Sequence, residues 1–336
     1  MKKILNYSII NISVSAFFIG LLFFSSYSFS QETKSLTQTI VWKQLADIPG
    51  GFYSGEVVTL NDEIYFVAGR NAVSLTPDFY KYNPKLNTWK KLSDIPNPAI
   101  NLAMAAVNGK IYAIGGDRFQ NTNREYNPQT NTWRILEPMP TARQHIDCGV
   151  YGDNIYISGG LTSWKNISKK HEVYNVSTNT WSEKAAIPSL RNNAAVVTLN
   201  DVIYVIGGAG TDEDVWADIW SVQTYNINSN KWTEKNNLPF KLFKPAAIVV
   251  NNKLMVLGGS TTIGENTVTL NKVLINNPES DEWIETTPLP SKNIFFGCTS
   301  IGNKIYVIGG TAGSESDWSE YTTVYEGEFI TNNSKN

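Results

Sequence analysis

The chain has 336 residues, a formal net charge of −2, 42% hydrophobic residues and only two histidines. A mildly acidic chain of this kind lacks the basic surface that phosphate recognition needs, so we expect no nucleic-acid partner. Two histidines cannot form a copper or zinc centre built on several imidazoles, and no phosphate-binding loop is present. We therefore expect neither a metal nor a cofactor.

The first thirty residues have the pattern of a secretory signal. Two lysines precede an apolar stretch at residues 9–24, and Ser28-Phe29-Ser30 forms a small-x-small cleavage site. We predict a signal peptide at residues 1–30, cleavage before Gln31 and export to the periplasm or the extracellular space. The apolar core is short for a spanning helix, so an uncleaved anchor is the less favoured alternative and no stable membrane span is expected after cleavage.

A sixfold repeat occupies the rest of the chain. In each unit a Pro follows a Trp by seven residues, and a Gly follows that Pro by twenty. The pairs are Trp42/Pro49, Trp89/Pro96, Trp133/Pro140, Trp181/Pro188, Trp232/Pro239 and Trp283/Pro290. A unit of 44 to 51 residues repeated six times predicts one closed array at residues 39–329. Residues 31–38 are then a short linker, and residues 330–336 a flexible tail.

Each unit reads as short strands joined by tight turns. In the second unit, the apolar runs 101–107 and 110–114 flank Asn108-Gly109, and a variable stretch then leads to Tyr126 and Trp133. Asn and Gly tolerate the positive φ that tight hairpin turns require. This pattern indicates four strands in each unit. In the fifth unit we place Ile275 at the Tyr position, with one residue more before the Trp.

The order of apolar run, Gly-Gly, spacer, Tyr and Trp resembles the kelch repeat over essentially the whole mature chain. This resemblance implies an all-β fold, a six-bladed kelch β-propeller with one four-stranded blade per repeat. The repeat region starts with a predicted strand at residues 40–45, which contains Trp42. It ends with Tyr325, which no Trp follows. We therefore predict that the N-terminal strand is the outermost strand of the last blade and closes the ring.

The two cysteines occupy equivalent places in units three and six. Cys148 and Cys298 each lie twelve residues before the second Gly of their unit. In a ring of six these places are on opposite sides of the axis, too far apart for a disulfide. We expect two free, buried thiols.

Length variation points to one face of the ring. The stretch between the second Gly and the Tyr position ranges from ten to seventeen residues, whereas the other spacings are nearly constant. In an up-and-down blade this strand 2–3 loop emerges on the same face as the connection to the next blade. Because scaffolds commonly vary the loops that bind, we predict the binding mouth on this variable face, around the central channel.

The residues three and five positions after each Pro supply the inner rim of that mouth. The ligand-binding candidates are taken from these positions and their neighbours. These are Phe52, Tyr53, Asn101, Arg143, Gln144, His145, Arg191, Asn193, Lys244 and Phe295. The guanidinium group of arginine binds carboxylates through two parallel hydrogen bonds, and aromatic rings provide flat apolar surfaces. Together these groups suit a sugar acid or an acidic peptide as the ligand. A structural role is the alternative for Arg143 and Arg191, and it is the favoured reading for His145.

The variable loops add aromatic candidates at the outer mouth. Trp164, Trp216 and Trp318 lie outside the repeat pattern and could stack on a sugar ring. The alternative is that these residues pack their loops against the blades.

Two functional hypotheses remain. The first is an exported, monomeric binding module that recognises a protein or carbohydrate ligand through the variable face. The alternative is a mutarotase or epimerase acting on a sialic-acid-like sugar, because the export and architecture are similar to those of bacterial N-acetylneuraminate epimerase. In that hypothesis Arg143 or Arg191 is the carboxylate clamp, and His145 or a loop acid moves protons.

Overall fold

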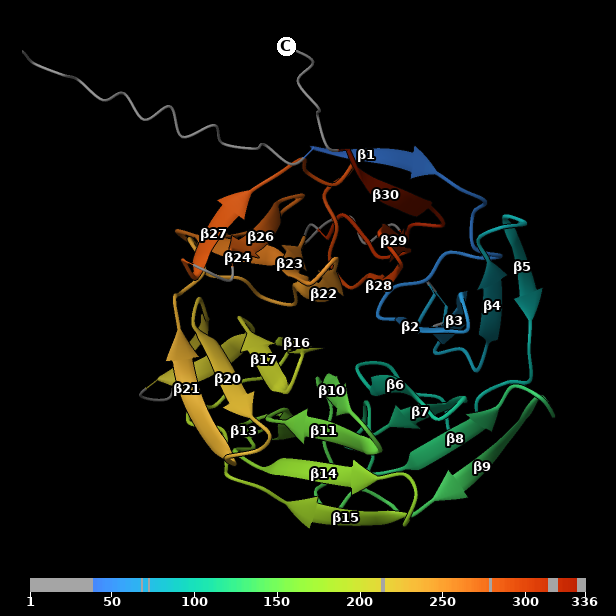
Figure 1. Cartoon of the computed structure of the whole chain (residues 1–336), viewed down its shortest axis with the longest axis horizontal. Coiled ribbons are helices and arrows are strands. Elements are labelled where there is room, and N and C mark those ends of the chain that lie inside the picture. Colours follow the sequence, from blue (N-terminus) through green and yellow to red (C-terminus); the bar gives the residue numbers. More distant parts are fainter. Residues whose placement is uncertain are drawn as a thin grey trace, which may run out of the picture. The chain divides into compact units, whose positions relative to one another are not determined.

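The computed structural model describes residues 39–67, 69–71, 73–212, 215–277, 280–313 and 320–330, without the side chains of residues 212, 215 and 216. All of them belong to one compact unit, Thr37–Asn336. The predictions of a signal peptide, a linker and a flexible tail concern residues outside the described part, except Ile330. The described strands form six four-stranded antiparallel sheets arranged as blades around a central axis (Figure 1).

Every blade runs from an inner strand to an outer one. Blade 1 contains β2 (Glu56–Leu60), β3 (Glu63–Val67), β4 (Phe79–Asn83) and β5 (Thr88–Lys91). Blade 2 contains β6 (Ala103–Val107), β7 (Lys110–Ile114), β8 (Asn123–Asn127) and β9 (Thr132–Leu136). Blade 3 contains β10 (Cys148–Tyr151), β11 (Asn154–Ser158), β14 (His171–Asn175) and β15 (Thr180–Glu183). Blade 4 contains β16 (Ala195–Leu199), β17 (Val202–Ile206), β20 (Val222–Asn226) and β21 (Lys231–Lys235). Blade 5 contains β22 (Ala246–Val250), β23 (Lys253–Leu257), β26 (Val273–Asn277) and β27 (Glu282–Glu285).

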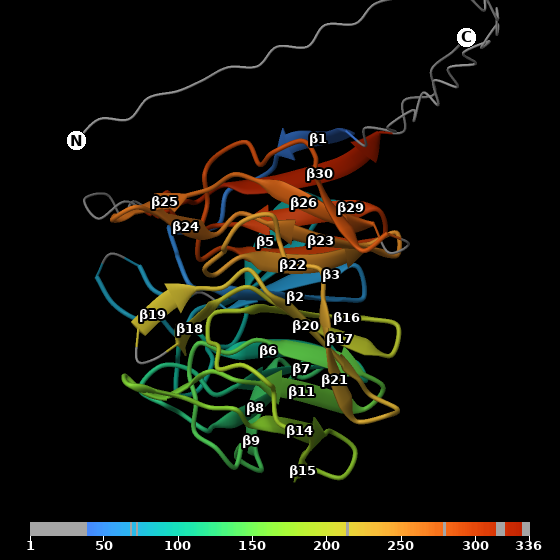
Figure 2. The same cartoon turned by 90° about the vertical axis from the view of Figure 1, so that its left-hand side faces the viewer.

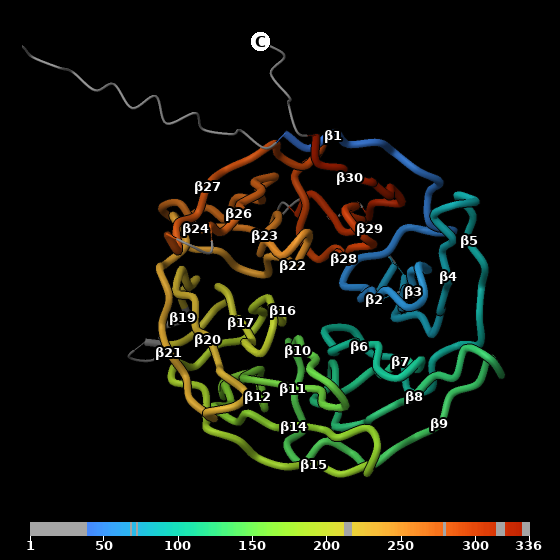
Figure 3. The backbone as a smooth tube through the Cα atoms, in the orientation of Figure 1, coloured from blue at the N-terminus to red at the C-terminus, as the bar shows by residue number. Residues whose placement is uncertain are grey.

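The sixth blade joins the two ends of the propeller. It contains β28 (Gly297–Ile301), β29 (Lys304–Ile308), β30 (Val324–Ile330) and, outermost, β1 (Thr39–Gln44). Strand β1 pairs with β30 from Thr39↔Ile330 to Gln44↔Tyr325, and Figure 3 shows the two ends of the colour range side by side there. The predicted six-bladed all-β propeller and its closure by the N-terminal strand are both confirmed.

The hydrophobic core lies between the blades rather than at one centre. Ala105 and Ile114 of blade 2, for example, pack with Ile155, Ile157 and Tyr174 of blade 3. Because side chains alternate along a strand, each sheet buries apolar residues on both faces, against the blade before it and the blade after it. The ring is therefore a series of similar interfaces.

A repeated polar contact joins the outer strands of blades 1 to 4 to the preceding blade. Asn179 Oδ1 accepts hydrogen bonds from the Tyr174 hydroxyl at 2.6 Å and from the Glu137 backbone N–H at 3.0 Å. Trp181 Nε1 donates to the Glu137 carbonyl at 3.0 Å. The same three bonds recur around Asn87, Asn131 and Asn230. We call this set the Tyr–Asn–Trp contact, and it explains the constant seven residues between Tyr and Trp.

Blade 5 departs from our assignment of the Tyr position. Asn276, and not Ile275, pairs with Trp283, as Tyr174 pairs with Trp181 in blade 3. Asn276 Nδ2 donates to Asp281 Oδ1 at 3.4 Å, which replaces the Tyr-to-Asn bond of the other blades. The assignment of Ile275 to the Tyr position was therefore wrong. Ile275 is the apolar residue nearest to the expected place, but the strand register puts Asn276 there and so keeps the usual seven residues before the Trp.

The two cysteines lie in strands β10 and β28, which are three blades apart. Both are free thiols; Cys148 is buried and Cys298 is half-buried.

Candidate functional site on the variable face

Three of the variable loops fold into two-stranded hairpins. Blade 3 carries β12 (Leu161–Ser163) with β13 (Asn166–Ile167), and blade 4 carries β18 (Ala209–Asp212) with β19 (Val215–Asp218). Blade 5 carries β24 (Ser260–Ile263) with β25 (Asn266–Thr269). Figure 2 shows the hairpins of blades 4 and 5 projecting on one side of the molecule. Isolated bridges such as Phe243↔Ser260 tie each hairpin base to the rim of the channel.

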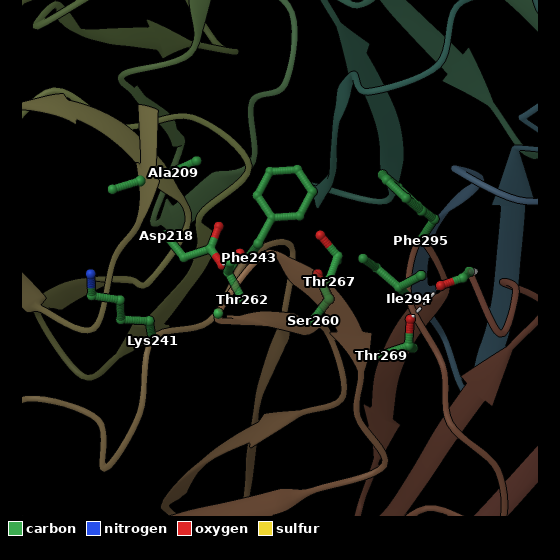
Figure 4. Close-up of a pocket in the computed structure, with 13 residues that line it drawn as sticks. Ala209, Asp218, Lys241, Phe243, Ser260, Thr262, Thr267, Thr269, Ile294 and Phe295 are labelled. Atoms are coloured by element: carbon green, nitrogen blue, oxygen red, sulfur yellow. Dashed lines mark hydrogen bonds between the residues drawn. The ribbon is translucent and has the colours of Figure 1, made fainter. Parts of the chain in front are cut away.

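A cleft of about 650 Å³ lies between the hairpins of blades 4 and 5. One of its walls is a single face of hairpin β24–β25, which presents the cross-strand pairs Ser260/Thr269 and Thr262/Thr267 (Figure 4). All four side chains carry hydroxyl groups. Ser260 is only 1% exposed and its Oγ has no hydrogen-bond partner in the described structure. A buried donor and acceptor left unpaired is costly, so this wall is suited to a polar ligand.

The remaining lining of the cleft is aromatic and charged. The rings of Phe243 and Phe295 lie 6.4 Å apart at an interplanar angle of 81°. Asp218 and Lys241 also line the cleft, and Asp218 Oδ2 accepts a hydrogen bond from Thr262 Oγ1 at 2.8 Å. The cleft thus combines apolar faces with charges of both signs, an arrangement that can hold a ligand by packing and by hydrogen bonds.

The rim of the channel is a ring of strained backbone positions. The residues five after each Pro have φ values between 48° and 58°, and they are Ser54, Asn101, His145, Asn193, Lys244 and Phe295. Backbone bonds link neighbouring blades here: Asn193 N–H donates to the His145 carbonyl and Lys244 N–H to the Asn193 carbonyl, both at 3.1 Å. Left-handed backbone is common for Asn but unusual for Lys and Phe, so the ring imposes it.

Below this rim a second cavity of about 360 Å³ follows the central channel. Its charged lining residues are Glu56, Asp147 and Lys244, from blades 1, 3 and 5. Lys244 Nζ lies 3.4 Å from Glu56 Oε1. Burial raises the pKa of Glu56 to about 7, although the Lys244 charge lowers it, and burial also raises the pKa of Asp147. Sequence reasoning missed both acids, which lie seven residues after their Pro.

His145 is neutral at physiological pH. Its Nδ1 is 2.8 Å from Asn193 Oδ1, and burial, with a smaller effect of the Lys244 charge, lowers the pKa of His145 to about 4. The imidazole of His145 is therefore protonated only at acidic pH. The geometry therefore agrees with the structural reading of His145 rather than with a general acid at neutral pH.

Both candidate arginines lie inside their blades and not at the mouth. Arg143 is fully buried, and donates to the Gly159 carbonyl at 2.8 Å and to Glu172 Oε2 at 2.6 Å. Arg191 is 1% exposed and donates to the carbonyls of Val205, Gly207 and Ser221. These bonds use the guanidinium groups to satisfy backbone carbonyls near the Gly-Gly turn. The geometry supports the structural alternative for both residues.

In blade 2, an arginine from a different strand donates to the carbonyls near the Gly-Gly turn. Blade 2 has Ala99 where blades 3 and 4 have arginine, and Arg124 of β8 instead reaches the Gly115 carbonyl at 3.3 Å. Arg124 is also fully buried. A guanidinium that binds a carbonyl of the Gly-Gly turn thus recurs in blades 2, 3 and 4, which strengthens the structural reading.

The other rim candidates divide between core and mouth. Phe52 is 3% exposed and packs with Phe66 and Tyr80 in the core, while Tyr53 forms a backbone bridge to Arg70. Gln144 is fully buried and pairs with Leu161 through its backbone. Lys244 lines the channel and Phe295 lines the cleft. Asn101 is 6% exposed with an unpartnered Oδ1, and Asn193 donates to Asn192 Oδ1.

Of the three candidate tryptophans Trp164, Trp216 and Trp318, Trp164 alone has a described side chain. It is 69% exposed and its ring packs edge-on against Phe119 at 5.3 Å. Trp216 belongs to β19, opposite Thr211, but its side chain lies outside the described part, as does the whole of Trp318.

The described ranges contain no group of three or more His, Cys, Asp or Glu side chains that could hold a metal ion. In the same ranges, no helix has the length and apolar character needed to cross a membrane.

Comparison with known proteins identifies relatives of the repeat. The Attractin/LZTR1 beta-propeller model matches residues 111–333, and the Kelch motif model matches residues 52–96. Kelch-like protein 23 of Mus musculus is 30% identical over 105 residues, 31% of this chain and 17% of that protein. Alpha-scruin of Limulus polyphemus is 29% identical over 109 residues, 32% of this chain and 12% of that protein. The match thus spans only a small part of either relative.

Among solved structures, that of YjhT superposes with a TM-score of 0.73. It covers 87% of this chain and 98% of the other at 19% sequence identity, so the likeness concerns the fold.

Proposed function

Because this chain belongs to the Attractin/LZTR1 family of kelch-repeat β-propellers, we propose that it is an exported, monomeric binding module that holds a protein ligand on its variable face. Kelch propellers serve in general as protein-binding modules.

The cleft between hairpins β18–β19 and β24–β25 is the observation that carries this proposal. A short protein segment needs hydrogen-bonding partners for its backbone and apolar contacts for its side chains. The hydroxyl wall, with the unpartnered Ser260 Oγ, offers the first, and Phe243 with Phe295 offers the second. Asp218 and Lys241 would select charge on the ligand.

A carbohydrate is the second candidate ligand, and the same wall favours it. Four hydroxyl side chains on one hairpin face, with a carboxylate and two aromatic rings nearby, can pair with sugar hydroxyls and stack on a sugar ring. The protein ligand remains our first choice because the cleft is open and continues onto the exposed hairpins.

The epimerase hypothesis has less support from the geometry. Its carboxylate clamp was assigned to Arg143 or Arg191, whose guanidinium groups are committed to backbone carbonyls inside the blades. The hypothesis gives its proton transfer to His145 or a loop acid, and His145 is neutral near pH 7 because burial lowers its pKa to about 4. Binding without chemistry is therefore the simpler function for this site.

The test selects peptides from a displayed random library on the full chain and compares two aromatic truncations. Phe243→Ala removes part of the cleft lining, and Tyr151→Ala removes an exposed aromatic ring in β10, outside the cleft. We expect selected peptides to lose about tenfold or more in affinity with Phe243→Ala and to keep it with Tyr151→Ala. Peptides that bind both variants equally would refute the cleft as the site.

A parallel experiment separates the other two hypotheses. Proton NMR of the same variants with neutral and acidic sugars records saturation transfer and anomer exchange together. Saturation transfer that depends on Phe243 would support the carbohydrate ligand, and accelerated anomer exchange would establish the epimerase. Export is tested by N-terminal sequencing of the protein from the cell envelope or medium, where a chain starting at Gln31 is expected.

A further inference from the structure

Two further hollows adjoin the cleft on the variable face. A groove of about 440 Å³ is lined mainly by hairpin β18–β19 and the loop that follows it. A second groove, of about 460 Å³, is lined by hairpin β24–β25 and the connection from blade 4 to blade 5. Trp220 lines both grooves, and Lys241 lines both grooves and the cleft, where it lies at the opposite end from Phe295 (Figure 4). The three hollows therefore form one surface with Lys241 at its centre.

The two grooves expose large apolar side chains. Trp220 is 50% exposed, and Ile263, across the second groove, is 63% exposed. Phe240 and Leu270 are half-buried and line the same groove. Exposed apolar side chains gathered in a groove mark a place where a partner binds, and tryptophan contributes most to such contacts because it buries much area with few rotatable bonds. We therefore expect a large apolar side chain of the ligand to pack on Trp220.

Two lysines of this surface have no partner in the described structure. Lys241 is exposed, and its Nζ makes no ion pair or hydrogen bond with a described residue. The same holds for Lys169, which lines the first groove together with Trp220. The next residue along the chain, Lys170, pairs instead with Glu183 on the neighbouring strand. Lys169 and Lys241 are thus available to a ligand.

The other charges of the described lining are already engaged. Lys272 pairs with Glu285, outside the grooves. Asp218 is the single carboxylate among the described residues that line the three hollows, and its Oδ2 accepts a hydrogen bond from Thr262 Oγ1 at 2.8 Å. The described lining therefore has more positive than negative charge available to a ligand. A surface of this kind attracts carboxylates and disfavours a basic partner.

We propose that the protein ligand of the variable face is an acidic segment, in which Asp or Glu lies beside a large apolar side chain. The apolar side chain packs on Trp220, and the neighbouring carboxylate pairs with the Lys241 ammonium. Because both residues line the same two grooves, the two ligand groups are close together, and side chains two residues apart in an extended chain point to the same side. We expect a spacing of about two residues between them. This inference rests on the proposed function and names the chemistry of its ligand.

The first experiment selects peptides from the displayed random library on the full chain and on two charge reversals. Lys241→Glu reverses the charge at the centre of the surface. Lys165→Glu, the control, reverses an exposed lysine on the hairpin of blade 3, outside all three hollows. We expect peptides selected on the unchanged chain and on Lys165→Glu to be enriched in Asp and Glu near an aromatic or aliphatic residue. Selection on Lys241→Glu should lose that enrichment and favour Lys and Arg instead.

The second experiment measures the affinity of one synthetic peptide, the most enriched sequence, by calorimetry. Trp220→Ala and Lys241→Ala should each weaken binding about tenfold, and Lys165→Ala should leave it unchanged. A peptide whose Asp and Glu are replaced by Asn and Gln should bind the unchanged chain about tenfold more weakly. It should lose much less affinity for Lys241→Ala, because that variant already lacks the ion pair. This comparison needs no change in the protein beyond one exposed side chain.

The outcomes separate this inference from the proposed function. Peptides that depend on Phe243 but carry no excess of acids, or that bind Lys241→Glu unchanged, would overturn the inference and leave the cleft as the binding site. Enrichment of Lys and Arg on the unchanged chain would also overturn it, because the ligand would then have the opposite charge. Peptides that are indifferent to Phe243→Ala, or a library that yields no binder, would count against the proposed function and this inference together.

Discussion

The two faces of the propeller differ in how much the six repeats vary from blade to blade. On the face of the strand 1–2 and 3–4 turns, the Tyr–Asn–Trp contact recurs in four blades with the same three bonds, and blade 5 retains a version of it. On the variable face, three loops form hairpins and the rim residues differ in every blade except for the two asparagines. A ring stabilised by equivalent contacts between blades can accept different loops elsewhere, so stability and binding are placed on separate faces.

The largest expected effect comes from opening the ring. Deletion of residues 31–46 removes β1, and with it six backbone register pairs to β30. Because the blades stabilise one another in series, we expect loss of the cooperative thermal transition seen by circular dichroism. Deletion of residues 331–336, beyond β30, is the control and should leave the transition intact. A normal transition without β1 would show that closure is dispensable.

The next effect separates a buried ion pair from an exposed one. Arg143→Met leaves Glu172 as a buried charge without its cation, and we expect about 3–5 kcal/mol less free energy of unfolding by urea denaturation. The control Lys272→Met breaks a pair with Glu285 in which the side chains are 43% and 49% exposed, and should cost no more than about 1 kcal/mol. Equal losses would mean that Arg143 is not the structural group described above.

A smaller effect compares asparagines on the two faces. Asn179→Ala removes the acceptor of the Tyr174 hydroxyl and of the Glu137 N–H, for an expected loss of about 1–2 kcal/mol in the free energy of unfolding. Asn166→Ala, at an exposed hairpin position on the variable face, should change it by less than about 0.5 kcal/mol. If both variants lose the same amount, the repeated contact does not concentrate stability on its face.

The smallest effect is a pH dependence within the channel. The folded-state pKa of His145 is about 4, below its ordinary 6.5, so the unfolded chain binds more protons and stability falls as the pH drops from about 6.5 to 4. His145→Gln should remove about 2 kcal/mol of that loss between about pH 7 and pH 5 in urea titrations. A pH profile identical to that of the unchanged chain would contradict the depressed pKa.

Glu56 acts in the opposite direction. Its folded-state pKa is raised from 4.5 to about 7, so stability falls as the pH rises through that interval. Relative to the unchanged chain, Glu56→Gln should therefore be more stable at about pH 8 than at about pH 5. A variant whose relative stability moves the other way would contradict the raised pKa of Glu56.

The blade count, the closure by β1 and the face on which the loops vary could all be predicted from the sequence. These features follow from spacing, because a strand, its turn and the contact to the next blade repeat at fixed distances from Trp, Pro and Gly. The left-handed backbone of the residues five after each Pro was not predicted and is seen only in the structure.

Tertiary structure decided where the side chains at those positions point. Arg143 and His145 are two residues apart, yet one is buried beneath a Gly-Gly turn and the other stands in the rim. Glu56, Asp147 and Lys244 are distant in sequence and converge only because the ring brings alternate blades to one axis. In blade 5, the strand register pairs Asn276 with Trp283, so Asn276 occupies the position that Tyr has in the other blades. Spacing repeats from unit to unit, but the direction and partners of a side chain depend on neighbours that only the closed ring supplies.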